Sequence, residues 1–281
     1  YGGTVRMFES IGEKRGVTFS YVDTSDIELV RKSIRKETKA LYIETPSNPT
    51  MKVTDFAAMR EIADEYGLLI IADNTFLTPY FQKPLTLGAD LVVHSGTKFL
   101  GGHNDVLAGF VCIKGKGLSE KLRYTYKTVG CCLSPFDSFL VLRGIKTLSV
   151  RLERQQENAK KIALWLKDRP EVKAVYYTGL PEHPGYEINQ KQASGCGSMI
   201  SFKVDSEKRA RKLLESVKLI SYAESLGGVE SLITYPMLQT HGDVPVETRE
   251  RLGITEDFLR MSVGIENAED LIADLEQALA E

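Results

Sequence analysis

The chain has 281 residues, of which 42% are hydrophobic and 26% charged, and its formal net charge is −2. This composition is ordinary for a folded protein, and the length is sufficient for two domains. The small negative charge argues against nucleic acid or an anionic membrane as the main partner. No apolar run reaches membrane-spanning length, and we expect neither a membrane segment nor a signal peptide.

The four cysteines do not have the spacing of a metal site or of a disulfide framework. Cys112, Cys131, Cys132 and Cys196 form no Cys-x-x-Cys pair and no Cys/His ligand pattern, so we expect no metal. The neighbours Cys131 and Cys132 are poor disulfide partners. We therefore expect reduced thiols and a cytoplasmic protein.

In the first half of the chain, helical and strand patterns alternate. The expected strands are residues 17–22, 39–44, 68–72, 91–93 and 109–113. Helices are expected at residues 4–15, after the capping box at 25–28, and from the cap at 54–55 to residue 66. This alternation predicts an α/β fold with a mainly parallel sheet covered by helices on both faces.

The second half begins with a long helical region that Ser134 and Pro135 open. We expect it to kink near Gly144, to end at Lys167 and to link two domains, at residues 1–144 and 145–281. Shorter strands (172–177, 199–204, 220–223, 259–263) and helices (207–216, 268–279) then predict a smaller α+β domain. The basic residues Arg151 and Arg154 fit a solvated helix face.

The strongest chemical signal is Lys98, which follows an apolar strand within Ser95-Gly96-Thr97-Lys98. A lysine at the carboxyl end of a buried strand loses hydration, which lowers its pKa and favours covalent bonding to a carbonyl. The hydroxyls of Ser95 and Thr97 are suited to a phosphate. This combination suggests pyridoxal phosphate (PLP), although the tetrapeptide alone also fits an ordinary turn.

Asp73 supports the cofactor interpretation because it ends another apolar run, residues 68–72. Parallel strands bring their carboxyl ends to one edge of the sheet, so Asp73 and Lys98 should lie close together. A carboxylate there can keep the pyridine nitrogen of PLP protonated. Taken alone, Asp73 also fits a helix N-cap.

Six ordered motifs then resemble those of the Cys/Met-metabolism PLP-dependent enzymes. They are Tyr-Gly-Gly-Thr at 1–4, Glu-Thr-Pro-Ser-Asn-Pro-Thr at 44–50, Ala-Asp-Asn-Thr at 72–75, Ser-Gly-Thr-Lys at 95–98 with Gly-His-Asn-Asp at 102–105, Ser-Leu-Gly-Gly-Val-Glu-Ser at 225–231, and Leu-Arg-Met-Ser-Val-Gly at 259–264. The resemblance covers nearly the whole chain. It implies the PLP-dependent transferase fold of type I, with a large PLP domain and a smaller C-terminal domain.

The resemblance also implies the roles of individual residues. Lys98 would bind the cofactor covalently and shuttle protons, and Asp73 would pair with the ring nitrogen. Asn48 would bind the ring oxygen and contact substrate, Ser95 and Thr97 would bind the phosphate, and Tyr1 would stack on the ring and assist proton transfer. Arg260 would hold the substrate carboxylate with Ser225 beside it, as a planar guanidinium does well.

Glu224 is the position that bears on the reaction. The resembling γ-synthases and γ-lyases carry an acid there, which can meet the distal ammonium of cystathionine or of cysteine. Gly3 agrees, because methionine γ-lyases carry cysteine at that position. We expect γ-replacement of O-acyl-homoserine by cysteine, as in cystathionine γ-synthase. The alternatives are γ-elimination of cystathionine, as in cystathionine γ-lyase, and an O-acetylhomoserine sulfhydrylase.

The start of the chain leads to two further expectations. The sequence begins with Tyr1, inside a motif, and lacks a glycine-rich phosphate turn before its first helix, so we expect an upstream part to be missing. A folded but catalytically incomplete fragment therefore stays an alternative. The resemblance also implies a homotetramer built of dimers, in which neighbouring subunits complete the active site.

Overall fold

The N-terminal half is built around a four-stranded sheet in the order β1-β2-β3-β4. The computed structural model describes residues 1–239 and 252–280. The strands are β1 (Ala40–Glu44), β2 (Leu69–Asp73), β3 (Leu91–Ser95) and β4 (Gly109–Ile113). The first two pairings are parallel and β4 is antiparallel to β3, so the sheet is mainly parallel as expected.

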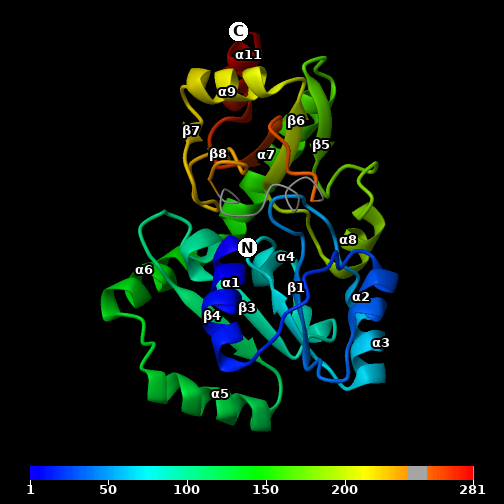
Figure 1. Cartoon of the computed structure of the whole chain (residues 1–281). Coiled ribbons are helices and arrows are strands. Elements are labelled where there is room, and N and C mark those ends of the chain that lie inside the picture. The colour runs from blue at the N-terminus through cyan, green and yellow to red at the C-terminus, as the bar shows by residue number, and fades with distance from the viewer. Residues whose placement is uncertain (240–251, 281) are drawn as a thin grey trace.

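Helices connect and cover these strands (Figure 1). They are α1 (Gly2–Met7), which continues through a π turn (Phe8–Gly12) and a 3-10 turn (Glu13–Arg15), then α2 (Ile27–Ser33), α3 (Phe56–Tyr66), α4 (Thr78–Phe81) and the 3-10 turn Pro84–Thr86. Asp55 caps α3 by accepting hydrogen bonds from two backbone amides, and Gly67 ends it in the left-handed region. The buried faces of α2, α3, β1 and β2 form one hydrophobic core.

A second sheet of five strands, in the order β5-β6-β9-β8-β7, forms the C-terminal half. Its strands are β5 (Val172–Tyr176), β6 (Met199–Val204), β7 (Ser221–Tyr222), β8 (Leu232–Thr234) and β9 (Phe258–Ser262). Most pairings are antiparallel, and only β7 and β8 run parallel. The helices α7 (Leu148–Lys167), α9 (Glu207–Ser216) and α11 (Ala268–Ala280) pack on this sheet and share its core.

Three further helices contribute no residue to the two hydrophobic cores described above. They are α5 (Lys116–Val129), α6 (Pro135–Ile145) and α8 (Tyr186–Gln192). Ser134 caps α6 by accepting a hydrogen bond from the Asp137 amide. The long helical region is interrupted between the end of α6 at Ile145 and the start of α7 at Leu148, close to the kink expected near Gly144. Figure 1 shows the N-terminal half below and the C-terminal half above, with Tyr1 at the junction between them.

Several expectations about local structure were wrong. Residues 17–22 form no strand, because Phe19 instead stacks on Phe8 with ring centroids 4.4 Å apart. The helix cap near residue 25 is Asp26, whose side chain accepts from the Leu29 amide. The helices α4, α5 and α8 and the strand β8 were not predicted. The residues of α5 follow an amphipathic pattern, but none of them is buried in this chain.

Arg151 does not belong to a solvated face. Its side chain is only 4% exposed, whereas that of Arg154 is 43% exposed. The two residues are three positions apart on α7. The Arg151 side chain points into the protein, where it donates to the Phe99 carbonyl in the π turn that also contains Lys98. The four cysteines form no disulfide. No helix within residues 1–239 and 252–280 is long and apolar enough to cross a membrane.

Candidate active site

Lys98 lies in the π turn Gly96–Leu100 that follows β3 directly. Its backbone departs from helical geometry (φ −93°, ψ −128°), which turns the side chain out of the helical path. Gly96 permits the turn to close against β4, because a Cβ at that position would lie 2.5 Å from the Phe110 ring. The Lys98 Nζ donates a hydrogen bond of 2.8 Å to the Ser225 hydroxyl, across from the other half of the molecule.

The environment of Lys98 favours its neutral amine. Burial lowers the pKa of Lys98, and the nearby cation of Arg260 lowers it further. The Glu224 carboxylate has the opposite effect and raises the pKa of Lys98. A lysine with a lowered pKa is a better nucleophile toward a carbonyl group near neutral pH.

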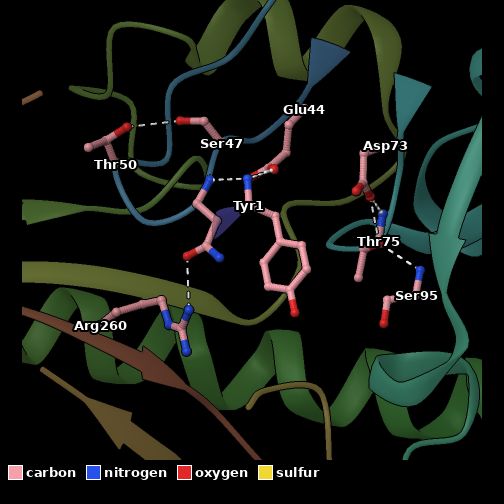
Figure 2. A network of polar contacts seen from close by, with 9 residues as sticks. Tyr1, Glu44, Ser47, Thr50, Asp73, Thr75, Ser95 and Arg260 are labelled. Carbon is pink, nitrogen blue, oxygen red and sulfur yellow. Dashed lines mark hydrogen bonds and ion pairs between the residues drawn. The ribbon is translucent and has the colours of Figure 1, made fainter. Parts of the chain in front are cut away.

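Asp73 and Ser95 are joined by Thr75, as the right side of Figure 2 shows. The Thr75 hydroxyl donates to Asp73 Oδ1 at 2.6 Å, and the Thr75 amide donates to the same oxygen at 3.0 Å. The same hydroxyl accepts from the Ser95 amide at 2.9 Å. Because β2 and β3 are parallel neighbours, this hydrogen-bond chain ties their carboxyl ends together.

Arg260 lies on β9 and is 1% exposed. It donates to Asn48 Oδ1 at 2.9 Å, to the Ser225 carbonyl at 2.9 Å and to the Thr234 hydroxyl at 3.0 Å. Its Nε has no hydrogen-bond partner among the described residues. Burial lowers the pKa of Arg260 to about 10, although the carboxylates of Glu224 and Glu44 oppose this shift.

Tyr1 extends its ring between these two groups of residues (Figure 2). Its amino nitrogen lies 2.6 Å from Glu44 Oε2, and Glu44 Oε1 accepts from the Asn48 amide at 2.6 Å. Glu44 therefore connects Tyr1 to the loop whose Asn48 side chain reaches Arg260. Gly3 leaves room for the Tyr1 ring in this position: a Cβ there would lie 2.6 Å from the ring, so a larger residue would require the ring to shift.

These side chains surround one pocket. Eight of the nine predicted site residues line it: Tyr1, Asn48, Asp73, Ser95, Lys98, Glu224, Ser225 and Arg260. The ninth, Thr97, lies beside the pocket, where its hydroxyl exchanges hydrogen bonds with the Ala108 backbone at 3.1 and 3.4 Å. The pocket spans the junction of the two sheets and combines apolar surface with a few converging polar groups, as small-molecule sites do.

The sequence analysis missed several residues of the pocket. Thr75 and Glu44 were inside recognised motifs but were given no role, and Pro46, Phe76 and Leu226 add apolar surface. The role of Thr75 could have been predicted from the sequence, because the residue two positions after an aspartate often donates a hydrogen bond to its carboxylate. Tyr42 lies close to Asp73. Burial raises the pKa of the Tyr42 hydroxyl, and the Asp73 carboxylate raises it further.

Comparison with known proteins identifies the family. The model of a family described as "Cys/Met metabolism PLP-dependent enzyme" matches residues 1–280. The chain belongs to this family. PLP is therefore its cofactor, and the chain is a PLP-dependent transsulfuration enzyme of cysteine and methionine metabolism.

Several relatives of this Cys/Met-metabolism enzyme are named as lyases. Cystathionine gamma-lyase of Bacillus subtilis (strain 168) is 51% identical over 279 residues, 99% of this chain and 74% of that protein. Cystathionine beta-lyase of Coxiella burnetii is 48% identical over 282 residues, 99% of this chain and 73% of that protein. The structure of cystathionine gamma-lyase from Lactobacillus plantarum, complexed with L-serine, superposes with a TM-score of 0.97 at 44% identity and covers 100% of this chain and 74% of that one.

The pocket of this PLP-dependent enzyme contains groups that suit the cofactor. Lys98 has a lowered pKa and an accessible amine, Asp73 offers an oriented carboxylate, and the Tyr1 ring and Phe76 offer apolar surface. The buried Nε of Arg260 without a partner matches an acidic ligand, since such a group otherwise remains unsatisfied. The chemistry of the pocket thus fits PLP together with an amino-acid substrate.

Proposed function

We propose that this enzyme cleaves cystathionine by γ-elimination and, with water, releases cysteine, 2-oxobutanoate and ammonia, as a cystathionine γ-lyase does. The sequence analysis placed γ-replacement first, but the names of the relatives support a lyase. The observation that carries the choice of the γ position is Glu224, which lies exposed at the pocket and acts electrostatically on both Lys98 and Arg260. The resemblance associates an acid at this position with γ-enzymes and an aromatic residue with β-lyases.

Lys98 is the proposed covalent attachment point and proton carrier. When bound, PLP withdraws electrons from the substrate and so acidifies the protons at its α and β carbons. The Lys98 amine, whose pKa is lowered by burial, would take and return these protons. The Ser225 hydroxyl, 2.8 Å away, orients the amine within the pocket.

Asp73, Asn48, Ser95 and Thr97 are the proposed cofactor contacts. The Thr75 hydrogen bonds hold the Asp73 carboxylate in a fixed plane, suited to a protonated ring nitrogen. Ser95 and Thr97 follow β3 at the same edge and present hydroxyls for the phosphate. The Tyr1 ring would cover the cofactor face and assist proton transfer.

Arg260 is the proposed binding group for the substrate carboxylate. Its hydrogen bonds to Asn48, Ser225 and Thr234 fix the guanidinium plane, while the unpartnered Nε leaves donor capacity. A buried guanidinium with fixed orientation binds a carboxylate bidentately with little further ordering. Substrate held there presents its distal end toward the exposed side chain of Glu224.

Product analysis tests the proposal directly. Incubation with cystathionine and PLP should yield 2-oxobutanoate and cysteine, whereas a β-lyase would yield pyruvate and homocysteine. Added cysteine with an O-acyl-homoserine, in place of cystathionine, tests γ-replacement. Glu224→Leu should damage cystathionine cleavage far more than turnover of a small substrate with a γ-leaving group. Equal loss on both substrates would contradict the role of Glu224.

We also propose that two copies of the chain associate through α5 and α6. Large apolar side chains are exposed along them, including Tyr124, Val129, Phe136, Phe139 and Leu142. Exposed apolar patches of this kind mark protein interfaces, and a homo-oligomer is the simplest partner. Light scattering after gel filtration should give a multiple of 31.3 kDa, and Phe136→Lys with Leu142→Lys should reduce it.

A further inference from the structure

Arg151 is a buried cation on α7 that no acidic side chain among the described residues neutralises. It donates from Nη1 to the Phe99 carbonyl at 2.9 Å, from Nη2 to the Gly144 carbonyl at 2.9 Å, and from Nε to the Thr147 hydroxyl at 3.1 Å. Burial alone lowers its pKa. Taking a guanidinium out of water without a counter-charge is costly, so its acceptors must be well oriented.

Both carbonyl acceptors belong to the last turn of a helical segment. Phe99 lies in the π turn Gly96–Leu100, and Gly144 lies near the end of α6. Carbonyl groups at such ends carry partial negative charge and can accept from donors outside the helix. The Gly144 carbonyl also accepts from the Thr147 amide at 3.2 Å and from the Thr147 hydroxyl at 3.1 Å. Arg151 therefore fastens the turn that contains Lys98 to the junction of α6 and α7.

The backbone packs closely around Arg151 at two glycines. Gly102 has a φ of +74°, and a Cβ there would lie 2.2 Å from Arg151 Nη1. Gly144 packs directly on the same turn, since a Cβ would lie 2.3 Å from the Gly101 carbonyl oxygen. The guanidinium is thus enclosed by the two segments that it joins.

The Phe99 carbonyl is separated from Lys98 by a single peptide unit. Lys98 has a non-helical backbone, and its own carbonyl accepts from the Gly102 amide at 2.7 Å. The next carbonyl along the chain is the one that Arg151 holds. Any rotation of the Phe99 peptide would be passed to the Lys98 backbone and, through it, to the position of Nζ.

We propose that Arg151 is a positioning residue for Lys98, and that its guanidinium sets where the Lys98 amine stands in the pocket. This inference rests on the proposed role of Lys98 as the cofactor-binding lysine. It differs from a purely structural role, because it couples a residue outside the pocket to the reactivity of one amine. A displacement of about 1 Å at a reacting group can reduce a rate by up to about 100-fold.

The test compares Arg151→Lys and Arg151→Met with Arg154→Met, a matched control whose side chain is 43% exposed on the same helix. Each protein is freed of PLP and then mixed with it, and the near-visible band of the lysine-bound cofactor is followed in time and across pH. Steady-state kcat and KM with cystathionine and the thermal unfolding midpoint are recorded on the same samples. Thr147→Val is a milder variant, for use if Arg151→Met does not fold. It removes the hydroxyl that accepts from the Arg151 Nε and donates to the Gly144 carbonyl, each at 3.1 Å, and leaves the two carbonyl contacts of Arg151 in place.

We expect Arg151→Lys to bind PLP at Lys98 about 10- to 100-fold more slowly and to lose a similar factor in kcat, with KM changed less than about threefold. Thr147→Val should show the same pattern more weakly, and Arg154→Met should match the wild type. The inference is overturned if the Arg151 and Thr147 variants lower only the unfolding midpoint and keep wild-type rates. If the wild type itself forms no band, the proposed function fails, which is a separate outcome.

Discussion

Thr75→Val removes one hydroxyl from the pocket while it keeps the shape of the side chain. The Thr75 oxygen accepts from the Ser95 amide, so its single proton is committed to Asp73, at 2.6 Å. Valine would break both bonds together. The Asp73 carboxylate would keep only the Thr75 backbone amide from this residue, and the link between β2 and β3 at the pocket edge would be lost.

The size of the effect follows from the type of each bond. A hydrogen bond to a charged group contributes about 1.5–3 kcal/mol, and an unsatisfied buried amide costs about 1–3 kcal/mol. Thr75 is only partly buried, so we take the lower end of each range, and the unfolding free energy should fall by about 2.5 kcal/mol. If about half of this loss appears in cofactor binding, at 1.4 kcal/mol per factor of ten, PLP affinity should fall roughly tenfold.

The assay is a PLP titration followed by the near-visible band, together with urea unfolding of the cofactor-free protein. Thr75→Ser should restore both properties, because it returns the hydroxyl. Thr178→Val is the matched control, since the Thr178 hydroxyl is buried but donates to the Cys196 carbonyl at 3.1 Å, outside the pocket. Unchanged PLP affinity in Thr75→Val would refute the idea that this hydrogen-bond chain aligns the cofactor site.

Three further predictions follow from the same structure. Because Glu224 raises the pKa of Lys98 against burial and Arg260, Glu224→Gln should lower that pKa and shift the pH midpoint of PLP attachment downward; an upward shift would contradict it. Ser225 has a φ of +89°, so Ser225→Gly should be about 1 kcal/mol more stable to urea than Ser225→Ala, while both impair turnover; equal stabilities would argue against backbone strain. The buried Asp274 accepts from three successive backbone amides at 2.8 to 3.1 Å, so Asp274→Ala should cost about 3 kcal/mol in urea unfolding, and a loss below about 1 kcal/mol would contradict this.

Sequence patterns predicted best the elements with clear caps and buried faces. The strand β6 and the helix α9 were predicted to the residue, because an apolar run and a Ser206 cap define them. The helix α5 escaped prediction although its sequence is amphipathic, and its apolar side chains, such as Tyr124 and Val129, are exposed in this chain. The segment 17–22 shows the opposite failure: its β-forming residues include Phe19, which packs on Phe8 and pairs with no strand.

The candidate site was predicted from strand ends and motifs, which determine which side chains reach the sheet edge. Those rules placed Asp73, Ser95 and Lys98 at one pocket. They could not find Arg151, because helical charge spacing does not reveal that one arginine of a basic run turns inward to bond two carbonyl groups. Such contacts depend on the packing of α6 and α7 against a turn about 50 residues earlier in the chain, which local patterns do not encode.

The pocket exists only because the two halves of the molecule hold each other through their reactive groups. Lys98 reaches Ser225 across 127 positions of sequence, and Arg260 reaches Asn48 across 212. Gly227 allows this approach, since it has a φ of +80° and a Cβ there would lie 2.7 Å from the Phe99 amide nitrogen. The contacts that join the two sheets are therefore the same ones that orient the lysine and the guanidinium. A substitution that loosens this junction should weaken substrate binding and proton transfer together, whereas a substitution in either sheet's own core should alter stability first.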